Sequence, residues 1–195
     1  MPSNKEIEIK FRIADLRRLN LQLRRAGFRL LTQRTHEMNT LYDLPGFPLR
    51  KRGELFRLRK YGSGWVLTHK AKGKAGRHKT RIELETRVDD GKKMALILDA
   101  LGFVPTFRYE KFRAEWRDPQ GHVVVDETPI GNFGEIEGPS RWIDRTAGLL
   151  GIRQQDYITD TYVNLFFNWK KAAHSTAKDM TFACIRGSGR NLTRN

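Results

Sequence analysis

Charged side chains alternate with apolar ones in five short segments of this chain, at residues 6–10, 57–59, 81–85, 111–113 and 135–137. Residues i and i+2 of a β-strand point to the same side of a sheet. Each segment therefore places its acids and bases on one face and its Ile, Leu or Phe on the other. Strands of this kind favour a barrel with a charged interior and an apolar exterior that helices can cover.

The same alternation is also typical of an outer strand whose polar face meets water. Solvent-facing positions normally include Thr, Ser, Gln and Asn, whereas the charged positions here are almost purely Glu, Lys and Arg. The acids also gather in some segments and the bases in others. This segregation favours one shared site over five independent solvent-exposed strand faces.

The predicted class is α+β, an eight-stranded antiparallel closed β-barrel with a charged lumen and helices packed outside. Eight strands are about the smallest number that can enclose a ligand. Strands are predicted at about 5–12, 28–43, 54–61, 65–70, 81–88, 107–116, 123–127 and 132–137. Helices are predicted from Asp15 to Gly27 and at about 90–101, 140–151 and 159–169, and a turn at 44–48.

The predicted domain spans residues 1–171, followed by a basic tail at 172–195. The tail is rich in Ser, Gly, Thr, Asn and Arg and poor in apolar residues, which is typical of a flexible segment.

A formal net charge of +15 indicates anionic partners. Cys184 is the only cysteine, so no intrachain disulfide can form and a reducing compartment is expected. No apolar run is long enough to span a membrane, and the first strand begins too early for a signal peptide. These features predict a cytoplasmic protein. The five histidines show no zinc-ligand spacing, and no P-loop motif occurs.

The acids of the charged faces predict a divalent-metal site. Carboxylates at i and i+2 lie about 7 Å apart along a strand, and several pairs in one lumen would repel unless cations intervened. Hard ions such as Mg²⁺ or Mn²⁺, one or two of them, match ligands that are all oxygen, and a bound ion can activate water. The candidate ligands are Glu6, Glu8, Glu83, Glu85, Asp126, Glu135 and Glu137.

The bases of the same faces predict a phosphate site. Arginine offers a planar fork that fits phosphate oxygens, and seven cations suit a triphosphate of roughly four negative charges. Their alternative role is to pair with the neighbouring acids, although so many buried ion pairs would be a poor way to stabilise a fold. The candidates are Lys10, Arg57, Arg59, Lys70, Arg81, Lys111 and Arg113.

The segment at 6–10 resembles the ExExK signature of the CYTH superfamily, the triphosphate tunnel metalloenzymes. This superfamily includes class IV adenylyl cyclases, thiamine triphosphatases and inorganic triphosphatases. The resemblance covers residues 5–138 closely. It continues in order through Arg57-x-Arg59, Lys70, Arg81-x-Glu83-x-Glu85, Lys111-x-Arg113, Asp126 and Gly131-x-Phe133-x-Glu135-x-Glu137.

The resemblance implies an eight-stranded tunnel that binds a triphosphate with one or two divalent ions. It places Glu6, Glu8, Glu135, Glu137 and Asp126 on the metal side and the seven bases around phosphate. Glu83 and Glu85 would organise metal or water. The chain departs from the family at 160–162, where Asp-Thr-Tyr stands in place of a common Ser-Tyr pair.

Two reactions fit such a tunnel, and triphosphate hydrolysis is favoured over cyclisation of ATP because it requires no orientation of a nucleoside. The candidate substrates are inorganic triphosphate, thiamine triphosphate and ATP. The general base is left open between Lys70 or Lys111, a metal-bound hydroxide and a carboxylate. A non-catalytic binder of polyphosphate or RNA ends, acting through the basic loop 71–81 and the tail, is the third hypothesis. Whether the protein is a monomer or a homodimer is also left open.

Overall fold

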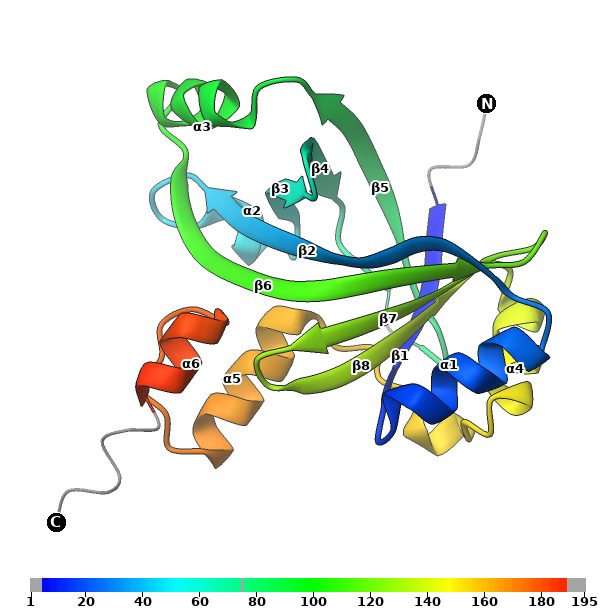
Figure 1. Cartoon of the computed structure of the whole chain (residues 1–195). Coiled ribbons are helices and arrows are strands. Elements are labelled where there is room, and N and C mark those ends of the chain that lie inside the picture. The colour runs from blue at the N-terminus through cyan, green and yellow to red at the C-terminus, as the bar shows by residue number, and fades with distance from the viewer. Residues whose placement is uncertain (1–4, 75, 189–195) are drawn as a thin grey trace, which may run out of the picture.

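The computed structural model describes residues 5–74 and 76–188, and eight strands form a closed antiparallel barrel within it (Figure 1). The prediction of the fold class is therefore confirmed. The strands follow the order β1-β5-β4-β3-β2-β6-β7-β8 around the barrel. They are β1 (Lys5–Arg12), β2 (Arg29–Asp43), β3 (Leu55–Tyr61), β4 (Gly64–Lys70), β5 (Lys79–Val88), β6 (Val104–Arg117), β7 (His122–Thr128) and β8 (Gly131–Glu137).

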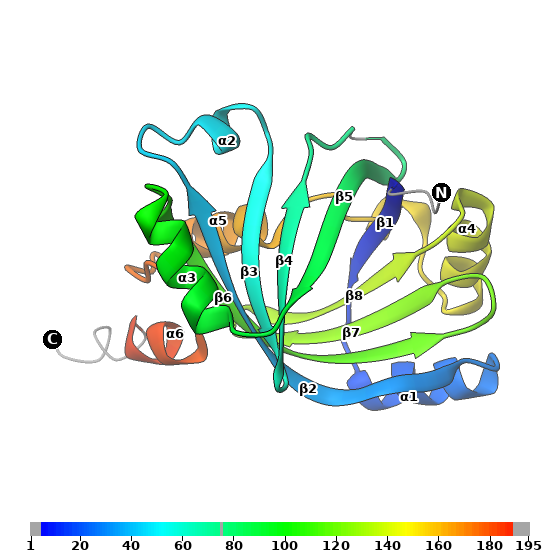
Figure 2. The same ribbon diagram turned by 90° about the horizontal axis from the view of Figure 1, so that it is seen from above.

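The longest strands, β2 and β6, pair along most of their length and form one wall of the barrel (Figure 1). Register shifts between Leu30 and Thr35 bend β2 as it leaves the first helix. The turn at Gly62-Ser63 joins β3 to β4, and Gly62 has a positive φ of 58°, which suits a glycine. Figure 2 shows the strands of the barrel from above, with α2 (Pro48–Lys51) and the β4–β5 connection at one end.

Two helices cover one part of the barrel exterior. The first, α1 (Leu16–Arg25), begins where Asp15 accepts a hydrogen bond from the backbone N–H of Arg18, which is a helix N-cap. Its Leu19 and Leu23 are buried with strand residues such as Ile9 and with α4 (Ser140–Leu149). The alternating apolar residues predicted to face outward therefore form this core.

A second core lies beneath α5 (Tyr162–Ala172), where Phe107, Phe133 and Phe166 are buried together. The remaining helices are α3 (Gly91–Ala100), the short 3-10 helix η1 (Gln154–Asp156) and α6 (Phe182–Ser188). The predicted turn at 44–48 is followed by the short α2, because Asp43 accepts hydrogen bonds from the backbone N–H groups of Leu49 and Arg50. No helix in the described ranges is long and apolar enough to cross a membrane.

The structure describes the predicted tail as far as residue 188, and this part packs against the barrel; its flexibility stays a prediction. The backbone of Met180 exchanges hydrogen bonds with Arg108 and Glu110 of β6, and its side chain is fully buried. The carboxylate of Glu110 also accepts from the backbone N–H of Phe182, at the start of α6. A few apolar residues, Ala177 and Met180 above all, are enough to dock this polar segment. The boundary at residue 171 stays a prediction, and residues 189–195 lie outside the described part.

Candidate active site

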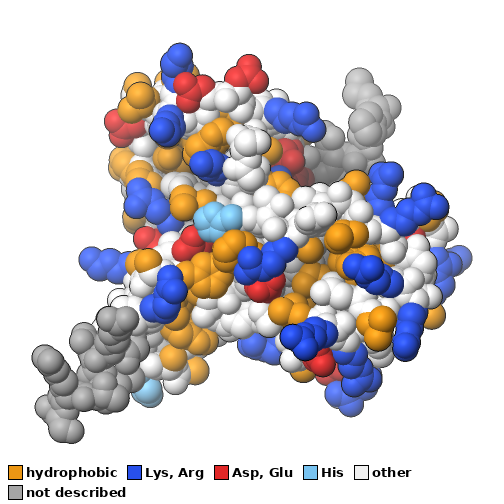
Figure 3. All heavy atoms as spheres, viewed as in Figure 1, with side chains coloured by type: hydrophobic (Ala, Val, Ile, Leu, Met, Phe, Trp, Pro, Cys, Tyr) orange, Lys and Arg blue, Asp and Glu red, His pale blue; other side chains and the backbone are white. Residues whose placement is uncertain are grey.

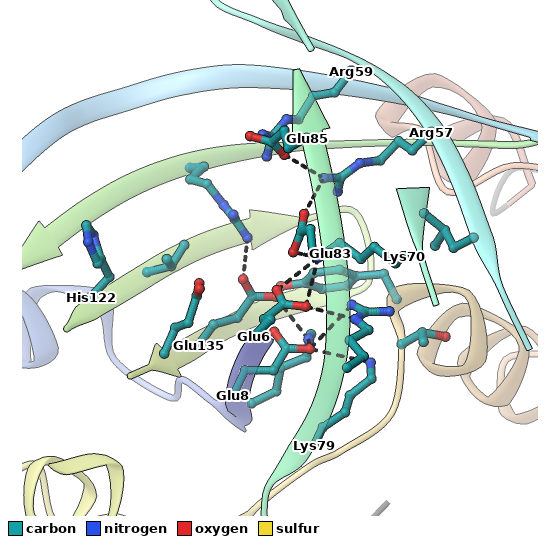
Figure 4. Close-up of a pocket in the computed structure, with 18 of the residues that line it drawn as sticks. Glu6, Glu8, Arg57, Arg59, Lys70, Lys79, Glu83, Glu85, His122 and Glu135 are labelled. Carbon is teal, nitrogen blue, oxygen red and sulfur yellow. Dashed lines mark hydrogen bonds and ion pairs between the residues drawn. The ribbon is translucent and has the colours of Figure 1, made fainter. Parts of the chain in front are cut away.

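The inward faces of the strands line one cavity of about 470 Å³ inside the barrel. Thirteen of the fourteen site residues that the sequence predicts line this cavity, and the fourteenth, Asp126, is buried beneath it. Figure 4 shows the labelled acids and bases from β1, β3, β4, β5 and β8 pointing toward one another. The ionic side chains of separate strands thus converge on a common channel.

The formal charges of the acids and bases around this cavity cancel. With Asp126 and one further buried acid, Glu37, nine acids and nine bases belong to the cavity and its wall among the described residues. The excess of positive charge is therefore on the outside, where Lys and Arg side chains are spread over the face shown in Figure 3.

Strands β1 and β8 bring one group of acids together, because Glu8 lies opposite Glu137 and Lys10 opposite Glu135 in their register. The Nζ atom of Lys10 lies 3.3 Å from Glu8 and 3.1 Å from Glu135. Burial opposes the charge on Lys10, but these two carboxylates outweigh it and raise the pKa of Lys10 above its ordinary value. Lys10 is therefore held as a cation among acids.

Glu6 is held by two bases from the neighbouring strands. Its carboxylate lies 2.9 Å from the Nζ atom of Lys70 and 2.8 Å from the Nε atom of Arg81. Burial would raise the pKa of Glu6, but Lys70 and Arg81 overcome it and bring the pKa well below its usual range. Lys70 also contacts Glu83 at 2.7 Å, so this ammonium group joins two acids.

Glu137 differs from the other predicted metal ligands because no basic side chain of the described residues lies within ion-pair distance of it. Burial, with the nearby carboxylates of Glu6 and Glu8, raises the pKa of Glu137 to about 7. An unpaired carboxylate beside two further carboxylates is a donor set that suits a hard divalent cation. Glu6, Glu8 and Glu137 therefore fit a metal chemically. In the present arrangement no group of three or more acids, histidines or cysteines among the described residues is placed to hold a metal ion.

Two arginines of β3 occupy another wall. Arg57 donates to the hydroxyl of Tyr109 at 3.2 Å and to Thr68 at 3.3 Å, while Arg59 donates to Glu85 at 3.0 Å. The Nε atoms of both arginines are buried without a hydrogen-bond partner in the described structure. Both arginines line the cavity, so their guanidinium groups can meet an anion that enters it.

Asp126 is the centre of a buried network and does not face the cavity. It accepts from the Nζ atom of Lys111 at 2.8 Å, from two nitrogens of Arg113 at 2.7 Å and from the hydroxyl of Tyr162 at 2.6 Å. These contacts occupy both oxygens, so Asp126 organises the bases of β6 in this arrangement. Its predicted role as a metal ligand stays a prediction.

Several site residues were missed from the sequence. Lys79 precedes the predicted start of its strand by two residues, and counting back from Arg81 would have placed it on the inward face. Its Nζ atom is 3.4 Å from Glu8. Burial, with Lys10 as the next cause, lowers the pKa of Lys79 to about 8. Tyr162, from α5, also lines the cavity, and its role gave no signal in the strand pattern.

Comparisons with known proteins agree with this geometry. The family model of the CYTH domain matches residues 4–155. A "putative adenylate cyclase" of Methanocaldococcus jannaschii is 27% identical over 133 residues, which are 68% of this chain and 75% of that protein.

Solved structures share the fold. A "putative adenylate cyclase" of Vibrio parahaemolyticus superposes with a TM-score of 0.76 at 16% identity, covering 85% of this chain and 99% of that one. A "putative adenylyl cyclase" of Hippeastrum, described as having a dominant triphosphatase activity, superposes with a TM-score of 0.62 at 19% identity, covering 84% and 95% of the two chains.

Proposed function

This chain belongs to the CYTH domain family, and from that premise we propose that it is a divalent-metal-dependent enzyme that hydrolyses the terminal phosphoanhydride of a triphosphate inside the tunnel. The observation that carries the proposal is the convergence of bases and carboxylates from six strands, β1, β3, β4, β5, β6 and β8, on one cavity. An anion binder would need the bases alone, whereas a metal-dependent enzyme also needs the acids.

The residues divide into two groups in this proposal. Glu6, Glu8 and Glu137 would hold the metal, which supplies Lewis-acid stabilisation and an activated water when it is bound. The cations of β3 and β6 would hold the phosphate oxygens and stabilise the charge that spreads over them as the terminal phosphoryl group departs. Arg57 and Arg59 line the cavity where those oxygens would lie, and Asp126 keeps Lys111 and Arg113 in place.

The identity of the general base stays a prediction. Lys70 lies within ion-pair distance of Glu6 and Glu83, and Lys111 lies that close to Asp126 and Glu37. The Nζ atom of each lysine is thus already engaged by two carboxylates. The arrangement therefore supports activated water on the metal side over either lysine.

The experiment is incubation of the purified protein with Mg²⁺ or Mn²⁺ and, separately, inorganic triphosphate, thiamine triphosphate and ATP. Metal-dependent release of phosphate is the expected result, and Glu8→Gln should lower its rate by at least ~10²-fold, the scale of losing one catalytic group. Glu127→Gln is the matched control, because Glu127 pairs with Arg34 at 2.7 Å between partly exposed side chains. Tight binding without turnover of any substrate would contradict the proposal and favour a binding protein.

Cyclisation of ATP is the second candidate, because the Methanocaldococcus relative bears the name of an adenylate cyclase. The same incubation with ATP separates the two reactions. Cyclic AMP with pyrophosphate would indicate a cyclase, and ADP with phosphate would indicate a triphosphatase. The Hippeastrum neighbour, with its described triphosphatase activity, supports hydrolysis as the first choice.

A further inference from the structure

A carboxylate that the charged-strand pattern did not reveal lies behind the phosphate-side bases. Glu37, on β2, stands opposite Tyr61 of β3 and Lys111 of β6. It is completely buried and does not line the cavity, whereas Lys111, Arg59 and Arg113 do. Glu37 is therefore one layer deeper than the bases that would meet a ligand.

Glu37 interacts with the neighbouring bases through its charge and makes no hydrogen bond to the two arginines. Its Oε1 atom lies 3.5 Å from the Nζ atom of Lys111, and its Oε2 atom lies 3.7 Å from Arg59 and 3.8 Å from Arg113. The two arginine distances exceed an ordinary hydrogen bond, and Oε2 has no hydrogen-bond partner in the described structure. Glu37 thus supplies negative charge to three bases without occupying the donors of the two arginines.

A neighbouring amide fixes the carboxylate in place. The Nδ2 atom of Asn39, two residues along β2, donates to Oε1 of Glu37 at 2.9 Å. Burial opposes ionisation, but Lys111, Arg113 and Arg59 together overcome it and hold the pKa of Glu37 well below its usual range. The carboxylate is therefore a permanent negative charge in the wall.

We propose that Glu37 is a positioning and specificity-determining residue for the triphosphate, a buried counter-charge that keeps three mutually repelling bases together and limits the attraction of the cavity for polyanions. The proposal rests on the proposed function of the tunnel. Without this charge, the cations of β3 and β6 would attract the ground-state anion more strongly. They would also lose the common partner that aligns them for the transition state.

The test compares Glu37→Gln with the wild type and with Glu127→Gln on the outer surface. Gln retains the shape of Glu37 and its acceptor for Asn39 but removes the charge. Inorganic triphosphate with Mg²⁺ is the probe, in steady-state kinetics and in calorimetric binding at two salt concentrations. The expected result is a KM and a Kd that fall about 10-fold, the scale of one nearby charge, while kcat falls by at least ~10-fold. The gain in affinity should be smaller for pyrophosphate, which carries less charge.

A purely structural role would lower activity without tightening binding. Unchanged or weaker binding of triphosphate by folded Glu37→Gln would therefore overturn the proposal. If Glu37→Gln does not fold, Glu37→Asp provides the second measurement, because it keeps the charge and should keep the wild-type KM to within about threefold. A larger change of KM in Glu37→Asp would also overturn the proposal. Calorimetric binding distinguishes this failure from failure of the proposed function. It measures the effect of Glu37 on the affinity for triphosphate even if the wild type hydrolyses nothing.

Discussion

Replacement of Asp126 by Asn should destabilise the barrel severely, because the carboxylate is the common acceptor of a buried network. Asp126 is completely buried and accepts from Lys111, Arg113 and Tyr162 at 2.6 to 2.8 Å. Asn keeps the shape but presents an amide N–H₂ toward some of these donors. It also removes the nearest negative charge from two buried cations, which keep only Glu37 and, for Arg113, Glu135 as acidic partners. Removal of one partner from a buried ion pair typically costs about 3–5 kcal/mol.

The contribution of each contact can be separated by a graded series. Tyr162→Phe removes one donor and leaves both bases paired, so we expect a loss of about 1.5–3 kcal/mol, the range for a hydrogen bond to a charged group. Glu127→Gln removes a partly exposed ion pair and should cost no more than about 1 kcal/mol.

Urea denaturation followed by circular dichroism measures all three variants. The expected order of destabilisation is Asp126→Asn, then Tyr162→Phe, then Glu127→Gln. In thermal unfolding, a loss of 3–5 kcal/mol corresponds to a melting temperature lower by about 6–20 °C for a domain of this size. If Asp126→Asn loses no more free energy of unfolding than the surface control, the network does not stabilise the fold and the reasoning is refuted.

Four further outcomes are expected. Glu137→Gln should lower metal-dependent turnover by at least ~10²-fold, and an unaffected rate would remove Glu137 from the metal site. Lys10→Ala should raise the KM for triphosphate while circular dichroism shows an intact fold; a normal KM would mean that Lys10 does not meet the substrate. Lys79→Met should raise the free energy of unfolding at pH 7, measured in buffer with a chelator. Burial lowers the pKa of Lys79 from 10.5 to about 8, so the charged form of Lys79 destabilises the folded protein below pH 8. The gain in stability, about 3 kcal/mol, should disappear as the pH rises from 8 toward 10.5, and a gain that does not depend on pH would contradict this explanation. Deletion of residues 173–195 should lower the free energy of unfolding by at least ~2 kcal/mol, because the buried Met180 is lost. Deletion of 189–195 alone is the control. Equal stability of the two variants would show that residues 173–188 do not stabilise the fold.

The sequence predicted the barrel and most of its lumen because the period of a strand is strict. Once Glu8 is known to face inward, Glu6 and Lys10 must do so as well. Glu37 escaped this logic because its strand, β2, carries Thr, His, Met and Asn around it and shows no alternation of charge. Its role appears only when β3 and β6 bring their bases to either side of β2.

Pairing inside the tunnel could not be predicted either, since it depends on register between strands that lie far apart in the chain. Lys70 meets Glu6 across sixty-four positions, and this contact requires the offset between β4, β5 and β1. The docked segment after α5 was missed for another reason. Its composition is typical of a disordered chain. An average over the segment does not reveal that a single methionine, Met180, is buried beside β6.

The balance of acids and bases within the tunnel has a consequence for how the protein behaves in solution. Because the interior is neutral by formal count, the net positive charge of the described residues belongs to the outer shell. Counter-ions in the medium screen such a shell within about 10 Å at ordinary ionic strength. Added salt should therefore lower the association rate of an anionic partner. It should leave the reaction rate of a molecule already bound in the cavity almost unchanged.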